Sequence, residues 1–286
     1  MSRPVKRSIL VDGMTRTYLR VAPAGETTGR ALVLVLHGSN QSAEAIRRYS
    51  DRTFDLLVCR GAVVAYLDGF RGDWNDARVV SISPARRNEV DDVAFVAAAI
   101  DDLAAKDNVD RTRVFIVGFS AGGYMAIRVI HEIPDRIAGA GLISATHAEA
   151  LNFTGSRYTS APMAVTLFHG TRDAFVRYDG ERARGRGFLR VGGMLSAPAT
   201  AEYFAHRNGI QAPATQHRIA DDVWETTYEE GEKPRVRLFT ITGSGHTIPG
   251  SRGHPIAGRS TRSIVAAQVL GDHWALPGPD ESAVAK

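Results

Sequence analysis

Six short apolar runs, each ending at a turn residue or just before one, constrain the fold of this 286-residue chain more than any other feature. In the first run, ALVLVLHG, the residues are apolar almost throughout and do not alternate with polar ones. Continuous runs of this kind indicate strands that are covered on both faces, as in a parallel sheet. The runs cover residues 31–38, 62–69, 113–120, 137–144, 163–170 and 235–243.

Helical patterns lie between these runs. In residues 89–105 the apolar side chains recur on one helical face, and Asp91 and Asp92 lie in the first turn, where the helix dipole favours acidic groups. Further helices are expected over residues 122–133, 197–208 and 261–274. Strands that alternate with helices predict a single α/β domain over residues 1–286, with a doubly wound, mostly parallel sheet.

Two segments depart from this alternation. Residues 8–11 and 16–21 flank Asp12-Gly13, which predicts an N-terminal hairpin. Residues 178–232 begin with a loop rich in Gly and Arg and end in an irregular stretch, with a candidate edge strand at Val223–Tyr228. We therefore expect residues 178–232 to form an irregular insert near the functional site.

Composition excludes several classes of function. The chain has 35 basic and 31 acidic residues, and this small excess gives no support for nucleic-acid binding. No stretch approaches the ~20 apolar residues of a membrane helix, and residues 1–10 lack the apolar run of a signal peptide. The single cysteine, Cys59, permits a reducing compartment. These features predict a soluble, cytoplasmic protein that binds neither nucleic acid nor membrane.

The stretch VGFSAGG places Ser120 at the junction of a buried strand and a helix. A G-x-S-x-G pattern in this context is typical of a nucleophile elbow, where glycines allow a sharp turn that exposes the serine. The amide of Ala121 lies beside the serine and can stabilise an oxyanion. A second oxyanion donor is expected in the loop LHGSN, where Gly38 lets the backbone approach closely and the amide of Ser39 is the candidate.

A nucleophilic serine needs a base, and the base needs an orienting acid. In open α/β sheets, functional groups gather at the C-terminal ends of the strands. His246 follows the last strand, with His254 as the alternative base, and Asp173 follows another strand, with Asp179 as the alternative acid. The order Ser120, Asp173, His246 is the order found in α/β-hydrolases.

Other motifs are missing from the sequence. There is no G-x-G-x-x-G after a strand, no P-loop and no Cys/His pattern that could hold zinc, so neither a cofactor nor a metal is expected. His37 and His169 also end strands, and we expect them to be structural.

Six stretches together carry a family resemblance: LHGSNQSA, DWND, VDDVAFVAAAIDDL, VDRTRVFIVGFSAGGYMA, FHGTRDAFVRYDG and GSGHTIPG. In these the chain resembles the feruloyl esterase / polyhydroxybutyrate depolymerase group of α/β-hydrolases. The resemblance implies an α/β-hydrolase fold, a metal-free mechanism and cleavage of carboxylic esters. It also implies Ser120 as nucleophile, Asp173 as acid and His246 as base.

Two residues are predicted to bind substrate. Trp74 follows a strand and is expected either to stack on an aryl or polymeric acyl group or to pin a surface loop. Relatives usually carry Trp where this chain has Ile248, which predicts a reshaped pocket beside His246. A run of arginines is expected to be solvated surface, with capture of a substrate carboxylate as the alternative: Arg182, Arg184, Arg186 and Arg190.

The expected function is that of a serine carboxylic-ester hydrolase with an acyl-enzyme intermediate. Its expected partner is a small-molecule or oligomeric ester, either an aryl (feruloyl-type) ester, a short-chain ester or a hydroxyalkanoate oligomer. The alternatives are a thioesterase or peptidase on the same fold, and a non-catalytic binding module. The complete set of serine, acid and base argues against the binding module.

Overall fold

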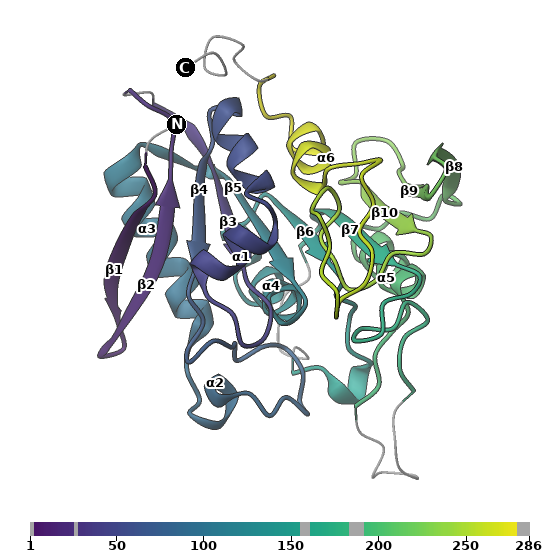
Figure 1. Cartoon of the computed structure of the whole chain (residues 1–286), viewed down its shortest axis with the longest axis horizontal. Helices are drawn as coiled ribbons and strands as arrows, with labels where there is room; N and C mark the ends of the chain where they lie inside the picture. The colour runs from purple at the N-terminus through teal and green to yellow at the C-terminus, as the bar shows by residue number, and fades with distance from the viewer. Residues whose placement is uncertain (1–2, 26–27, 155–160, 183–191, 279–286) are drawn as a thin grey trace.

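A computed structural model describes residues 3–25, 28–154, 161–182 and 192–278. Its strands form a ten-stranded sheet in the order β1-β2-β4-β3-β5-β6-β7-β10-β9-β8, shown in Figure 1. The strands are β1 (Val5–Val11), β2 (Met14–Val21), β3 (Arg30–Leu36), β4 (Val63–Leu67), β5 (Val109–Phe119), β6 (Gly139–Ile143), β7 (Ala164–Gly170), β8 (Thr215–Ala220), β9 (Val223–Tyr228) and β10 (Val236–Ile241).

The central six strands, from β4 to β10 in the sheet order, run parallel to one another. Every residue of β3, β4 and β6 is buried, as expected of strands with helices on both faces. The prediction of a doubly wound, mostly parallel α/β-hydrolase sheet is therefore confirmed.

The N-terminal hairpin is also confirmed. β1 pairs with β2 in antiparallel register from Val5–Arg20 to Val11–Met14. Asp12 and Gly13 both have positive φ, at 48° and 76°, as a two-residue hairpin turn requires. β2 then pairs antiparallel with β4, so the hairpin extends one edge of the parallel sheet.

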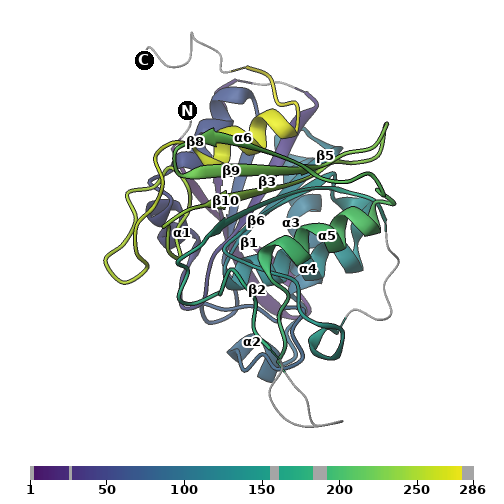
Figure 2. The same cartoon turned by 90° about the vertical axis from the view of Figure 1, so that its right-hand side faces the viewer.

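Helices cover both faces of the sheet. Side chains of α3, α4 and α5 enter one core cluster, and side chains of α1, η1 and α6 enter a second cluster on the opposite face. Figure 2 shows α4 and α5 together on one side of the sheet and α1 on the other. No helix of the described segments is long and apolar enough to cross a membrane. The helices are α1 (Ala43–Tyr49), η1 (Thr53–Arg60), α2 (Pro84–Arg87), α3 (Asp92–Asp107), α4 (Ala121–Glu132), η2 (Pro134–Arg136), η3 (Ala150–Asn152), α5 (Ala197–Arg207) and α6 (Ala266–His273).

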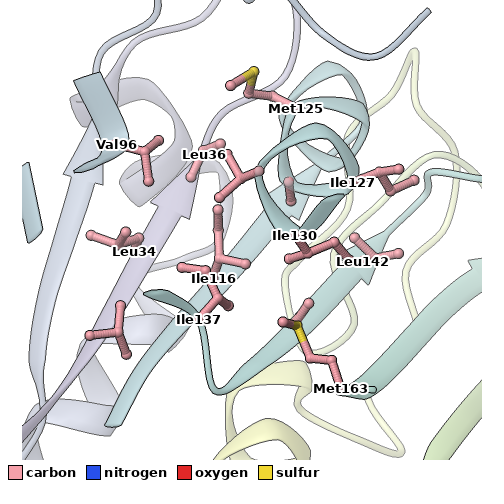
Figure 3. Packing of buried hydrophobic residues seen from close by; sticks show 14 of the residues in the cluster. Leu34, Leu36, Val96, Ile116, Met125, Ile127, Ile130, Ile137, Leu142 and Met163 are labelled. Carbon is pink, nitrogen blue, oxygen red and sulfur yellow. The ribbon is translucent and has the colours of Figure 1, made fainter. Parts of the chain in front are cut away.

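The first core cluster lies between the sheet and α3 to α5. Figure 3 shows Leu34 and Leu36 of β3, Ile116 of β5 and Leu142 of β6 next to Ile127 and Ile130 of α4. All of these side chains are at most 1% exposed. Because they come from neighbouring parallel strands and from one helix, this packing fixes α4 directly over the centre of the sheet.

Residues 178–232 are more regular than the predicted insert. They contain α5 and β9, which confirm the helix expected over residues 197–208 and the candidate edge strand at Val223–Tyr228, and also β8, which was not expected. β9 and β8 extend the sheet antiparallel from β10. The sequence could not predict β8, because five of its six residues are exposed and the strand therefore has no apolar pattern. The last helix begins at Ala266, later than expected.

Candidate active site

The turn from β5 to α4 holds Ser120 in an unusual backbone conformation, with φ at 54° and ψ at −119°. Two hydrogen bonds fix it there: the Ser120 amide donates to the Ile143 carbonyl over 2.9 Å, and the Ser120 carbonyl accepts from the Gly123 amide over 2.8 Å. The first bond joins the end of β5 to the end of β6. A positive φ at a residue other than glycine needs such support from its surroundings.

The glycines beside Ser120 leave no room for a side chain. A Cβ at Gly118 would lie 2.2 Å from the Gly122 carbonyl oxygen, and a Cβ at Gly122 would lie 2.3 Å from the Leu36 carbonyl oxygen. Both neighbours are backbone atoms of packed elements, so they cannot move aside cheaply. The two glycines are therefore required by the close contact of α4 with β5 and with the end of β3.

His246 and Asp173 are in direct contact. His246 Nδ1 lies 2.7 Å from Asp173 Oδ2, and the Asp173 side chain is fully buried. Asp173 Oδ1 accepts from the amides of Phe175 and Val176, each over 2.9 Å. Burial alone would raise the pKa of the Asp173 carboxyl, but the hydrogen bond and charge of His246 and the Val176 amide outweigh burial and lower it. Asp173 is thus held as a carboxylate against the ring of His246.

The loop after β10 is anchored on both sides of His246. The Tyr49 hydroxyl donates to the His246 carbonyl over 2.8 Å, and the His246 amide donates to the Ala257 carbonyl over 2.7 Å. The His246 ring packs against Phe119, with ring centroids 4.8 Å apart. Phe119 immediately precedes Ser120, so this contact brings His246 to the end of β5.

Ser120 and His246 line the same cavity, which has a volume of about 620 Å³. Ser39 and Ala121, the two residues whose amides were predicted to bind an oxyanion, line it as well. Ala121 is the first residue of α4, so its amide has no partner within the helix. A Cβ at Gly38 would lie 3.4 Å from Ser120 Cβ, so the loop that carries Ser39 runs directly beside Ser120.

The alternative base and acid are placed less favourably. Asp179 does not line this cavity, and no contact between Asp179 and a histidine is present in the described segments. His254 is exposed at the cavity wall, and its Nδ1 accepts from the Ile256 amide over 3.3 Å. The geometry therefore favours Asp173 over Asp179 and His246 over His254.

His37 and His169 have structural partners, as expected. His37 Nδ1 lies 2.7 Å from the Gly38 carbonyl, while its Nε2 accepts from the Gly69 amide over 2.8 Å. His169 Nε2 lies 2.8 Å from the Val176 carbonyl. Burial lowers the pKa of both imidazoles. In the described part of the chain, no group of three or more His, Cys, Asp or Glu side chains could hold a metal ion.

The prediction that Trp74 and Ile248 bind substrate is wrong. Trp74 is fully buried, its Nε1 donates to the His37 carbonyl over 2.8 Å, and it does not line the cavity. It pins its loop to the end of β3, which was the alternative interpretation. Ile248 is also fully buried and packs in the second core cluster. Both residues follow strands, but their side chains turn into the core.

The sequence analysis did not predict several residues that line the cavity. Tyr124 lies in the first turn of α4, four residues after Ser120, and this short separation in the sequence could have revealed it. Phe175 lies 5.2 Å from the His246 ring, centroid to centroid. Arg78 and Met194 come from distant segments, and no sequence signal links them to Ser120. Arg182 is exposed, whereas Arg184, Arg186 and Arg190 lie outside the described residues.

Comparison with known proteins shows which family the chain belongs to. Residues 20–184 match the phospholipase/carboxylesterase family. The protein NocK of Nocardia uniformis subsp. tsuyamanensis, whose name marks it as a provisionally assigned esterase, is 31% identical over 265 residues, which cover 85% of this chain and 74% of NocK. Feruloyl esterase B of Piromyces equi is 27% identical over 229 residues, which cover 78% of this chain but only 41% of that protein.

A solved structure shows the same fold. The acetyl xylan esterase of Aspergillus awamori superposes with a TM-score of 0.67 at 14% sequence identity, over 95% of this chain and 99% of that enzyme. The family matches more than half of the chain, and NocK is similar over most of it. These two findings assign the chain to a family. The chain belongs to the phospholipase/carboxylesterase family of α/β-hydrolases, a family of carboxylic ester hydrolases.

Proposed function

We propose that this esterase is a serine hydrolase that works through an acyl-enzyme intermediate, with Ser120 as nucleophile, His246 as general base and Asp173 as the orienting acid. The observation that carries the proposal is the 2.7 Å contact between His246 and the buried Asp173, at a cavity that Ser120 also lines. A carboxylate in this position favours the His246 tautomer that carries its proton on Nδ1, so Nε2 is left to accept a proton.

In the proposed reaction, His246 Nε2 removes the proton of the Ser120 hydroxyl as the Ser120 oxygen attacks the ester carbonyl. The amides of Ala121 and Ser39 stabilise the negative oxygen of the tetrahedral intermediate. The intermediate collapses when His246 returns the proton to the leaving alcohol, and an acyl-Ser120 ester remains. Water, activated by His246, then releases the acid and restores Ser120.

The proposed substrates are aryl esters of the feruloyl type, short-chain esters and hydroxyalkanoate oligomers. A cavity of about 620 Å³ has room for any of these acyl groups. Its wall combines the rings of Tyr49, Phe119 and Phe175 with polar groups, a mixture that suits a partly apolar ester.

Replacement of the nucleophile tests this proposal. We expect Ser120→Ala to lower kcat/KM for p-nitrophenyl butyrate by roughly 10³-fold or more. The matched control is Ser8→Ala, at an exposed position on β1, which should retain the parent activity. An Ser120→Ala protein that keeps near-parent activity rules the mechanism out. Faster turnover of an acyl-CoA or an anilide than of the oxygen ester would instead assign the same triad to a thioesterase or a peptidase.

A further inference from the structure

One wall of the Ser120 cavity is a small apolar cluster that is separate from the two main cores. It contains Tyr124 of α4, Val176 of the loop after β7 and Met194 of the segment before α5. Met194 is held in place by two backbone hydrogen bonds with Glu181, of 2.8 and 3.0 Å. The wall is therefore built from segments that are far apart in the sequence, including the segment after β6, which contributes Ala145 and Ala148.

Tyr124 is the polar member of this wall. The residue is only 6% exposed, yet it lines the cavity. Within the described segments its hydroxyl forms no hydrogen bond, and the hydroxyl oxygen is not among the buried unpartnered atoms, so it remains accessible from the cavity. The side chain of a helical residue leans toward the helix N-terminus, so Tyr124 leans back toward Ser120, one turn earlier.

Arg78 restricts the Tyr124 ring to this orientation. The Arg78 guanidinium carbon lies 4.0 Å from the centre of the ring. Arg78 is fixed in turn by two hydrogen bonds to the fully buried Asp76, of 2.7 and 3.0 Å. The ring is thus held between a fixed cation and the apolar cluster, and little freedom is left for the hydroxyl to turn away from the cavity.

A second hydroxyl lies in the same wall. Thr146 follows β6, lines the cavity and is fully buried, and its Oγ1 has no hydrogen-bond partner among the described residues. Ala145, its neighbour, would contact a Cβ at Gly123 at 2.4 Å, so this segment packs directly on the first turn of α4. Of these two hydroxyl groups, that of Thr146 is buried and that of Tyr124 is accessible from the cavity, so Tyr124 offers the hydroxyl that a polar atom of a ligand can reach.

The proposed mechanism determines which part of the ester meets this wall. At the attacked carbon, the carbonyl oxygen faces the amides of Ala121 and Ser39, and the leaving oxygen faces His246, which protonates it. With these two directions taken, the acyl chain is assigned to the wall of Tyr124 and Met194, which also lines the cavity. This assignment rests on the proposed function.

The electrostatics of the wall keep the Tyr124 hydroxyl protonated. Burial raises the pKa of the Tyr124 hydroxyl and Arg78 lowers it, while Asp76, Glu181 and Asp173 add to the rise. The hydroxyl therefore stays protonated and serves as a hydrogen-bond donor. A protonated hydroxyl pairs with an acceptor oxygen, which a hydroxyl, ether or carbonyl group can supply without a charge.

We propose that Tyr124 is a specificity-determining residue, whose hydroxyl donates a hydrogen bond to a neutral oxygen carried by the acyl chain of the ester. The enzyme then prefers hydroxy- or alkoxyacyl esters to alkyl esters of the same shape. A purely apolar acyl group would leave the Tyr124 hydroxyl desolvated and without a partner, which weakens its binding.

Isosteric substrates and an isosteric substitution test this inference. One substrate pair consists of the p-nitrophenyl esters of 3-hydroxybutyrate and 3-methylbutyrate, and a second pair of those of 3-methoxypropanoate and pentanoate. For at least one pair we expect Tyr124→Phe to reduce the preference for the oxygen-bearing ester, measured as the ratio of kcat/KM values, by roughly three- to tenfold. The melting temperature should not fall, because no hydrogen bond within the described protein is lost.

Tyr228→Phe provides the matched control, since Tyr228 lies on β9 and does not line the cavity. This variant should keep both ratios of the parent enzyme. The inference is overturned if Tyr124→Phe changes the two esters of each pair by the same factor, or if the parent enzyme shows no preference in either pair. Absence of all ester turnover in the parent enzyme would instead refute the proposed function, so the two failures are distinguishable.

Discussion

At the scale of single residues, the backbone of Ser120 is the most constrained feature of the site. Its φ of 54° and ψ of −119° are unfavourable for any residue with a Cβ and cost about 1–3 kcal/mol. Hydrogen bonds to Ile143 and Gly123 hold this conformation. The same strain exposes the hydroxyl at the C-terminal edge of the sheet, so the unfavourable backbone is coupled to the proposed chemistry.

The ionisation of Asp173 gives a prediction at this scale. A carboxyl whose pKa is lower in the folded than in the unfolded state stabilises the fold above its unfolded pKa, about 3.9, and this stabilisation is lost as the pH falls through the folded value. We therefore expect Asp173→Asn to be less stable than the parent near pH 7, with a difference that narrows below about pH 4. Urea unfolding of both proteins between pH 3 and 7 measures the difference in their free energy of unfolding. A stability difference that does not change with pH contradicts the prediction.

Single residues also show how far the sequence could be interpreted. Ser120, Asp173 and His246 could be selected because each directly follows a strand, and the C-terminal ends of parallel strands share one edge. Trp74 was selected by similar reasoning and Ile248 from the family resemblance, but the direction of a loop side chain depends on its packing. The sequence does not show that packing: both side chains turn into the core.

At the scale of elements, the site depends on how closely α4 approaches the strands beneath it. Gly122 touches the end of β3, and Gly118 touches the first turn of α4. These contacts bring the positive end of α4, with the amide of Ala121, against the loop that carries Ser39. The proposed oxyanion site is therefore a product of helix-to-strand packing as much as of the turn itself.

Insertion of one methyl group tests this packing. We expect Gly122→Ala to destabilise the protein by about 2–3 kcal/mol or more, because its Cβ would meet carbonyl oxygens of Leu36 and His37 at 2.3 and 2.6 Å. The control is Gly278→Ala, where a Cβ would meet no atom within 4 Å. Thermal unfolding compares the two. Equal melting temperatures would show that α4 can shift away from β3 without penalty.

Elements differ in how readily the sequence reveals them. The parallel strands could be recognised in the sequence because a strand that is buried on both faces needs apolar residues throughout. β8 lies at the sheet edge with polar, exposed residues, and only its pairing with β9 makes it a strand. Pairing of this kind depends on a partner segment and leaves no periodic signal of its own.

At the scale of the whole molecule, the sheet order explains why distant residues meet. β5, β7 and β10, which carry Ser120, Asp173 and His246 at their C-terminal ends, lie within four neighbouring strands of the order β5-β6-β7-β10. Parallel direction places all three ends at one edge. The insertion of β6 between β5 and β7 also brings Thr146 to the wall of the cavity.

A chemical prediction concerns the molecule as a whole. The proposed reaction uses only Ser120, His246, Asp173 and backbone amides, and Cys59 is the single cysteine, located in η1. Activity should therefore be the same with and without EDTA, and the same with and without dithiothreitol. A loss of activity in EDTA that added metal restores would require a different mechanism.

The most direct test of the central claim is covalent labelling with a fluorophosphonate, followed by peptide mass spectrometry. We expect one equivalent of the phosphonyl group on Ser120, in parallel with complete loss of esterase activity. Ser120→Ala should not be labelled, and His246→Ala should be labelled far more slowly. Inactivation with the label on another residue, or full activity after Ser120 has been labelled, would contradict the assignment of Ser120 as the nucleophile.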